Sequence, residues 1–162
     1  MTLLELHDRS LRTLAFRILG DRGEMDDALQ EVALKAFTAL PHFRGDSSFG
    51  TWIHRITYTT CLNHLRSSGR TVPLPDGEDC ADDVAGDPSD VLLLRVELAA
   101  ALDSLTTDQR AVVALVLEEG FDHRTAAEVL GVPEGTVASR LASARTKLRR
   151  LLRAFSPQRE DS

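Results

Sequence analysis

Residues 71–90 divide the chain, because nothing in this stretch favours a regular element. It reads TVPLPDGEDCADDVAGDPSD and contains three Pro, two Gly and seven acidic residues, with no Lys or Arg. Its apolar residues follow neither a helical nor an alternating period, and its like charges repel one another. We expect residues 71–89 to form an acidic flexible linker between units at 1–70 and 90–156, with a tail at 157–162.

Both units carry apolar residues at steps of three and four positions, the period of an amphipathic helix. Between the acidic pair at 26–27 and Pro41, these residues are Ala28, Leu29, Val32, Ala33, Ala36, Phe37 and Leu40. The period predicts helices over 3–19, 26–40, 48–69, 90–104, 107–119, 123–130 and 134–154. Strand alternation and internal repeats are not evident. We therefore expect an all-α protein of two small helical domains, stabilised by mutual packing or by a partner.

Composition and spacing argue against several classes of protein. The chain has no run of 18 apolar residues, and its first residues do not resemble a secretory signal. Cys61 and Cys80 lie 19 positions apart without a Cys-x-x-Cys pattern, which favours a reducing cytoplasm over a disulfide scaffold or zinc site. Neither a Ser–His–Asp arrangement, metal-ligand spacing nor a glycine-rich phosphate loop is evident. We expect no enzyme, no cofactor and no metal.

The last predicted helix is strongly basic, although the chain has a net charge of -6. Between Arg140 and Arg153 it holds six basic residues and no acidic one. An apolar stripe is formed by Val137, Leu141, Ala144, Leu148 and Leu151. The side chains expected to point away from this stripe are Ser139, Arg140, Ser143, Thr146, Lys147 and Arg150.

The segment before this helix predicts a helix-turn-helix. Gly131 can take the left-handed conformation that closes a short helix, Pro133 suits the start of the next one, and Asp122 is a competent N-cap. Ala127 and Val137 have the spacing of a small contact residue and an apolar anchor. In a major groove, base edges would be within reach of Glu134, Thr136, Ser139, Arg140 and Ser143, and phosphates within reach of Arg145, Lys147, Arg149 and Arg150. A solvated or membrane-surface helix is the alternative, which the lack of an aromatic residue before Phe155 disfavours.

A second signal lies in the N-terminal unit. Residues 43–52, FRGDSSFGTW, form a loop and the start of the predicted helix over 48–69. This helix then carries His54, Arg55 and Tyr58. Aromatic residues interleaved with basic ones suit stacking on unpaired bases together with phosphate contact. The alternative is that Trp52 and Phe49 are core residues.

Two long stretches resemble one family. Residues 17–56, RILGDRGEMDDALQEVALKAFTALPHFRGDSSFGTWIHRI, resemble the first conserved domain of group IV, extracytoplasmic-function (ECF) RNA polymerase sigma factors of the sigma-70 family. Residues 101–152, ALDSLTTDQRAVVALVLEEGFDHRTAAEVLGVPEGTVASRLASARTKLRRLL, resemble the second. They occur in the family's order, with the variable linker between them, and the likeness extends over residues 3–154.

The resemblance implies a protein that directs core RNA polymerase to promoters. Docking on the coiled coil of the largest subunit would use Asp26, Asp27, Gln30, Glu31, Leu34 and Lys35. Capture of the opened minus-10 element would use Phe43, Arg44, Ser47, Ser48, Trp52, Arg55, Tyr58, Thr59, Asn63 and Arg66. Reading of the minus-35 duplex would use Arg124, Glu134, Thr136, Ser139, Arg140, Ser143, Arg145 and Lys147. Further expected partners are the flap region of the second-largest subunit and an anti-sigma protein, without membrane insertion.

The sequence departs from the family pattern at some of these positions. Thr59 stands where many members have Asn, so the choice of minus-10 base does not carry over. Ser67 and Ser68 replace a run of Arg, which weakens phosphate contact there. Two other functions stay open: a stand-alone helix-turn-helix regulator, and a helical adaptor without salt-dependent DNA affinity. Specific initiation by core polymerase in the presence of this protein would distinguish a sigma factor from the regulator and from the adaptor.

Overall fold

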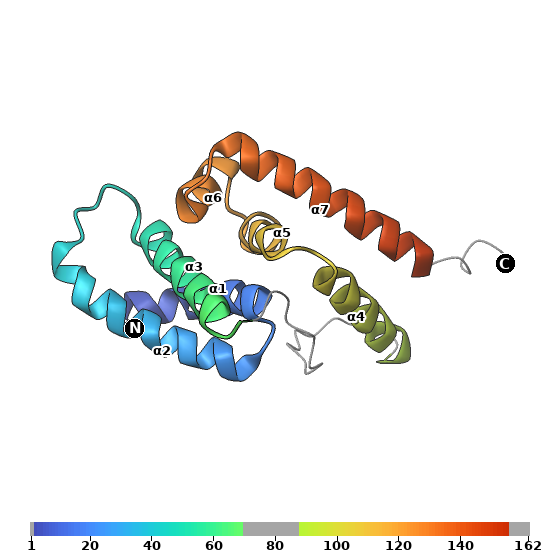
Figure 1. Ribbon diagram of the computed structural model, residues 1–162, viewed down its shortest axis with the longest axis horizontal. Coiled ribbons are helices and arrows are strands. Elements are labelled where there is room, and N and C mark those ends of the chain that lie inside the picture. Colours follow the sequence, from blue (N-terminus) through green and yellow to red (C-terminus); the bar gives the residue numbers. More distant parts are fainter. Residues whose placement is uncertain (1, 70–87, 156–162) are drawn as a thin grey trace.

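The computed structural model describes residues 2–69 and 88–155, and within these ranges every regular element is helical. Most of the predicted linker, residues 71–87, and the predicted tail lie outside the described residues, as does Cys80. None of the described helices is long and apolar enough to cross a membrane. Three helices precede the gap, and the helix-turn-helix follows it (Figure 1).

Each α-helix of the N-terminal unit begins at a polar cap. α1 (Leu3–Leu19) starts with a capping box between Thr2 and Glu5 and ends at Gly20, whose φ is 70°. α2 (Arg22–Ala39) is capped by the Asp21 side chain and is followed by the short 3₁₀ helix η1 (Leu40–His42). α3 (Phe49–Ser67) is capped by Ser48, and its β-branched residues do not interrupt it. These local signals explain why the three predicted helices form.

α2 differs from the prediction in two respects. It begins at Arg22, four residues before the predicted start, because Asp21 accepts a hydrogen bond from the Glu24 amide at 2.8 Å. Ala28, Val32 and Ala36 are buried as expected. Ala33 and Phe37 are exposed, which the apolar period did not predict.

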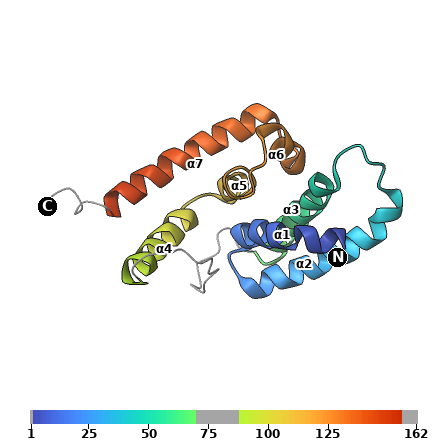
Figure 2. The ribbon, with the colours of Figure 1, turned by 180° about the vertical axis from the view of Figure 1, so that it is seen from behind.

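The C-terminal unit consists of a long first helix, a central helix that changes its winding and the helix-turn-helix. Its elements are α4 (Pro88–Asp103), α5 (Thr107–Val112), the π-helix η2 (Val113–Glu118), α6 (His123–Leu130) and α7 (Glu134–Phe155). The predicted helix over 107–119 is thus present, but its second half is wound as a π-helix. α6 is capped by Asp122 and ends at Gly131 with φ 65°, as the sequence predicts. α4 and α7 lie side by side at the far end of the molecule (Figures 1 and 2).

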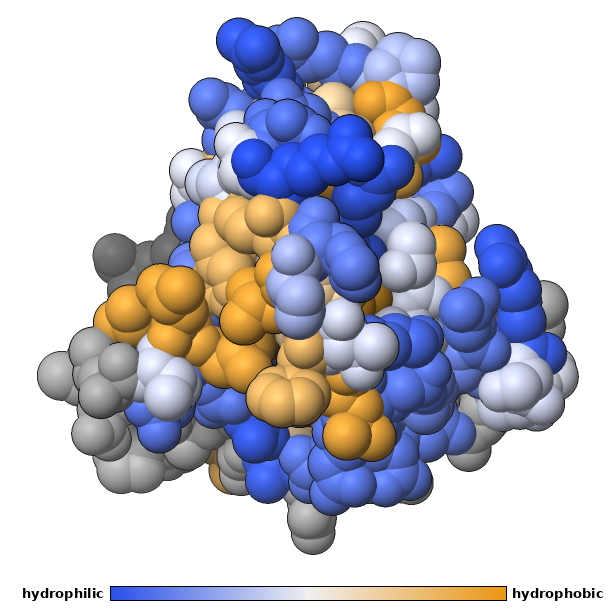
Figure 3. Space-filling model, turned by 90° about the vertical axis from the view of Figure 1, so that its left-hand side faces the viewer, coloured by the Kyte–Doolittle hydropathy of each residue, from blue (hydrophilic) through white to orange (hydrophobic). Residues whose placement is uncertain are grey.

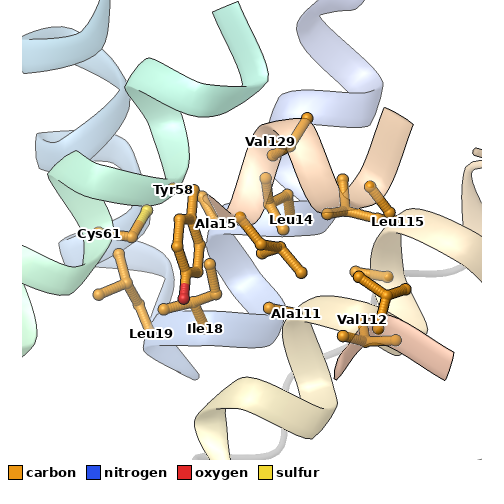
Figure 4. Close-up of a cluster of buried hydrophobic side chains, with 14 of the residues drawn as sticks. Leu14, Ala15, Ile18, Leu19, Tyr58, Cys61, Ala111, Val112, Leu115 and Val129 are labelled. Carbon is orange, nitrogen blue, oxygen red and sulfur yellow. The ribbon is translucent and has the colours of Figure 1, made fainter. Parts of the chain in front are cut away.

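The two units share one hydrophobic core. α3 packs against α6, and α1 packs against α5 and η2. Figure 4 shows one cluster in which Ile18, Tyr58 and Cys61 of the N-terminal unit lie together with Leu115 and Val129 of the C-terminal unit, all of them buried. Each unit alone would leave part of this apolar surface in water, so their contact stabilises both.

Polar and aromatic contacts also join the units. Arg17 Nε and Nη2 donate to the two carboxylate oxygens of Glu118 at 2.7 and 3.1 Å. The buried His54 ring lies 4.9 Å, centroid to centroid, from the ring of Phe121. Burial in turn lowers the pKa of His54, although its hydrogen bond to the Gly50 carbonyl opposes this. Because its other ring nitrogen lies 2.6 Å from Ser10 Oγ, a neutral ring has both nitrogens paired.

Candidate polymerase and nucleic-acid interface

α2 presents an exposed face that is apolar at one end and polar at the other. Leu34 and Phe37 are 70% and 81% exposed, although both are large apolar side chains. Asp27 and Gln30 are exposed on the turns before them, at helical spacing. Figure 3, which looks onto the end of the molecule near η1, shows apolar side chains gathered beneath a hydrophilic upper region. An exposed apolar patch with a polar border is typical of a protein-binding surface.

The other predicted docking residues of α2 contact neighbouring helices. Glu31 lies 2.6 Å from Lys35 and 2.8 Å from His64 of α3, and hydrogen bonds from Lys35 and then His64 lower the pKa of its carboxyl group. Lys35 Nζ also donates to Thr60 Oγ1 at 3.1 Å. Asp26 lies 2.9 Å from Arg12 of α1. The structure therefore separates Asp27, Gln30 and Leu34 on the open face from Glu31, Lys35 and Asp26 at its edges.

The loop before α3 is supported by a cluster of aromatic rings. The Phe43 ring centroid lies 5.0 Å from that of Trp52, and Phe49 lies 5.5 Å from Trp52. Phe49 and Trp52 pack against a small core formed by Leu11, Val32, Ala36 and Ile53. These aromatic residues therefore pack together as partly buried residues, whereas Arg44 is exposed. Ser48 accepts a hydrogen bond from the Thr51 amide at 3.1 Å, so its hydroxyl serves the helix start, and Ser47 precedes it.

α3 brings four of the predicted minus-10 residues onto one exposed stripe. Arg55, Thr59, Asn63 and Arg66 follow one another at steps of four, four and three positions, and all are exposed. Tyr58 is the exception, because it is only 6% exposed and lies in the shared core. Burial and the nearby charge of Asp108 raise the pKa of its phenol. Contact between Tyr58 and a base would require the two units to part.

The helix-turn-helix is packed as its sequence predicts. Ala126, Ala127, Val129 and Leu130 of α6 are buried against Val137 and Leu141 of α7 and against the rest of the core. The exposed surface at the start of α7 includes Glu134, Ser139 and Ser143, and farther along the helix Arg145, Arg149 and Arg150; Arg124 of α6 is exposed as well, and Thr136 is half-buried. Polar and basic groups thus line the side of α7 away from its core.

Two basic residues of α7 do not point away from the apolar stripe as predicted. Arg140 Nη2 lies 3.2 Å from an Asp108 carboxylate oxygen on α5, and only 25% of the Arg140 side chain is exposed. Lys147 donates to the Ser104 carbonyl beyond the end of α4. The sequence pattern missed both contacts, because α5 and the end of α4 lie against α7 only in the folded unit. It also missed Gln109, whose Nε2 donates to Ser143 Oγ at 3.1 Å.

A groove of about 650 Å³ separates the loop before α3 from the helix-turn-helix. Ser47, Trp52 and Arg55 line one side, and Arg124 and Glu134 line the other. Residues predicted to contact the two promoter elements thus face one groove in this arrangement. The described residues hold no group of His, Cys, Asp and Glu side chains suited to a metal ion.

Comparison with known families assigns both units. Residues 3–71 match Sigma-70 region 2, and residues 95–148 match Sigma-70, region 4. The ECF RNA polymerase sigma factor SigM of Mycobacterium tuberculosis is 38% identical over 152 residues, which cover 93% of this chain and 75% of that protein. The ECF RNA polymerase sigma-E factor of Escherichia coli K12 is 33% identical over 135 residues, which cover 76% of this chain and 71% of that protein.

Solved structures agree with these sequence relatives. The sigma factor RpoE of Bartonella quintana, in complex with the anti-sigma factor NepR, matches with a TM-score of 0.77 and 25% identity over 93% of this chain and 94% of that one. CnrH, in complex with the cytosolic domain of CnrY, matches with a TM-score of 0.70 and 28% identity over 95% and 87%. The chain belongs to the ECF sigma factors of the sigma-70 family, which direct core RNA polymerase to specific promoters and promote the initiation of transcription.

Proposed function

We propose that the open face of α2 is where this sigma factor docks on the coiled coil of the largest polymerase subunit. The observation that carries the proposal is the exposure of Leu34 and Phe37, 70% and 81%, beside Asp27 and Gln30. Apolar side chains next to polar groups suit a stable protein contact, since desolvated aromatic side chains supply much of the binding energy. Glu31 and Lys35 lie at the edge of this face and shape it through their contacts with α3.

Promoter DNA would be bound by two further surfaces. The exposed stripe of Arg55, Thr59, Asn63 and Arg66, with the loop that contains Arg44, fits the opened minus-10 strand, because basic and polar groups follow one helix face. The exposed side of α7 fits the major groove of the minus-35 element. The protein has no catalytic role of its own in this proposal, and polymerase supplies the chemistry in the cytoplasm.

Two further partners are part of the proposal. α4 exposes an apolar surface formed by Leu92, Leu93, Leu94, Val96 and Leu98, which suits the flap region of the second-largest subunit. An anti-sigma protein is supported by the solved relative RpoE, which is bound to the anti-sigma factor NepR, and CnrH is likewise bound to another protein domain, the cytosolic domain of CnrY. This chain matches each of them across both units, so a similar partner would meet a similar surface.

Replacement of Phe37 tests the docking face. Phe37→Ser removes an exposed aromatic group without opening the core, so we expect normal helicity and at least tenfold weaker binding to core polymerase, about 1.4 kcal/mol. Leu34→Ser should act in the same direction. Affinity is measured by titrating purified core enzyme with labelled full-length protein.

Leu6→Ser is the matched control, because Leu6 is an exposed leucine, 57% exposed, on α1 rather than α2. It should bind core polymerase like the unmodified protein. Equal affinity of the Phe37→Ser and Leu6→Ser variants would remove this face of α2 from the interface.

A further inference from the structure

The first turn of α5 contacts the polar side of α7 at two adjacent positions. Asp108 pairs with Arg140 at 3.2 Å, and Gln109 donates to Ser143 at 3.1 Å. Arg140 and Ser143 lie one turn apart on α7, and the sequence predicts that both contact the minus-35 element. A neighbouring helix therefore fixes the positions of two side chains on a surface proposed to read DNA.

This turn of α5 is itself held firmly. Thr106 and Gln109 form a capping box, with hydrogen bonds of 3.1 and 3.2 Å between side chain and backbone. Arg110 is buried and donates to the Leu105 carbonyl at 3.3 Å and to Thr107 Oγ1 at 3.4 Å. Because both ends of the turn are fixed, the carboxylate of Asp108 occupies a defined place beneath α7.

A paired guanidinium behaves differently from a free one. A free Arg side chain has many rotamers, and its charge attracts any nearby phosphate regardless of sequence. A carboxylate on Nη2 offsets the charge and restricts the rotamers, so what the group retains is directional hydrogen bonding. Arg140 Nη1 is buried and makes no hydrogen bond within the described residues, so this donor would reach a base only if the side chain moved outward.

We propose that Asp108 is a positioning residue for promoter recognition, which holds the Arg140 guanidinium so that it reads a base of the minus-35 element instead of gripping a phosphate. The inference rests on the proposed role of α7 and adds a residue outside the helix-turn-helix to the determinants of specificity. Asp108 acts through Arg140 and needs no contact with DNA of its own.

The test uses holoenzyme assembled from core RNA polymerase and the full chain, bound to a promoter library randomised at the minus-35 element. Asp108→Asn removes the charge and keeps the shape. We expect its preference for the best over the average minus-35 sequence to fall about tenfold, while its affinity for the average sequence is equal or higher. Asp108→Glu should restore the preference in large part.

Glu128→Gln is the matched control. Glu128 lies on α6, 3.7 Å from Arg124, and its side chain is 49% exposed, against 50% for Asp108. The control removes the same unit of negative charge near the DNA surface, so it should raise affinity evenly and keep the preference. If Glu128→Gln lost as much preference as Asp108→Asn, both effects would be due to charge alone and the proposal would be overturned.

Two further variants test whether Asp108 acts through Arg140. Arg140→Ala should lose the preference, and Asp108→Asn added to it should cause no further loss, because the two residues form one unit. The inference would be contradicted if the double variant lost more preference than Arg140→Ala alone. It would also be contradicted if a folded Asp108→Asn variant kept its full preference for the best minus-35 sequence. If the unmodified protein showed no preference among minus-35 sequences, this result would instead refute the proposed role of α7, on which the inference rests.

Discussion

Burial changes the chemistry of single side chains where the two units meet. Cys61 is fully buried in the shared core, and its pKa is raised from 9.0 to about 12, first because burial disfavours the thiolate and then because Glu31 is negative. A thiol with this pKa is a poor nucleophile at neutral pH. Cys61 is therefore a packing residue.

The raised pKa predicts a loss of stability at alkaline pH. The folded state keeps the Cys61 proton up to about pH 12, whereas the unfolded chain releases it above pH 9.0. Stability due to this group is thus complete below pH 9.0 and lost as pH rises above it, by up to about 1.4 kcal/mol per pH unit. Urea unfolding at several pH values, in a Cys80→Ser background, should show a steeper alkaline loss with Cys61 than with Cys61→Ala. Parallel losses would assign the effect to other groups, such as Tyr58.

A few hydrogen bonds stabilise the end of a helix, and the start of α6 is stabilised by one carboxylate. The Asp122 side chain accepts a hydrogen bond from the Thr125 amide at 2.7 Å, and this bond lowers the pKa of the carboxyl group. α6 carries Ala126, Val129 and Leu130 into the core, so loosening its first turn weakens the contact between the units.

The Asp122 cap predicts an acid-sensitive helix end. A lowered pKa means that the stabilisation is present above the ordinary carboxyl range and is lost as pH falls through the folded value. Asp122→Ala should lower the Tm at neutral pH, and the difference from the unmodified protein should shrink in acid. Asp122→Asn can still cap the helix and should keep a Tm that responds less to acid. If the difference in Tm between Asp122→Ala and the unmodified protein were the same at every pH, this role of the carboxylate would be contradicted.

These elements also show how far the sequence predicts the structure. Caps and stops are local, so Ser48, Asp122 and Gly131 marked helix ends that the structure confirms. The exposed face of α2 and the contacts of Arg140 depend on which helices lie alongside, and such pairings join residues distant in sequence. Periodicity therefore predicted Phe37 on the apolar side of its helix and Arg140 pointing away from the apolar stripe of α7. In the structure Phe37 is exposed, and Arg140 pairs with Asp108 of α5.

The shared core and the ion pair between Arg17 and Glu118 hold the described parts of the molecule in a closed arrangement. The Arg17–Glu118 pair is bidentate, and each of its side chains is less than a third exposed. It joins α1 to the end of η2 and contributes about 1 kcal/mol to closure. In this arrangement Tyr58 is buried, so a contact between its ring and DNA would require the two units to part.

Loss of this ion pair should shift the protein towards open forms. We expect Glu118→Gln to widen the distance distribution between fluorophores placed on α2 and α7, and to raise affinity for promoter DNA in holoenzyme. Arg12→Gln is the control, because Arg12 pairs with Asp8 and Asp26 within the N-terminal unit alone. Identical distance distributions in the two variants would show that the Arg17–Glu118 pair does not govern closure.

A core shared by two units has a consequence for the fate of the protein in the cell. Parting the units exposes side chains such as Ile18, Leu115 and Val129 to water, where proteases and chaperones recognise apolar segments. The closed form hides these segments. The parted, unbound protein is then the vulnerable species, so we expect its turnover in the cell to follow the supply of partners more closely than its own rate of synthesis.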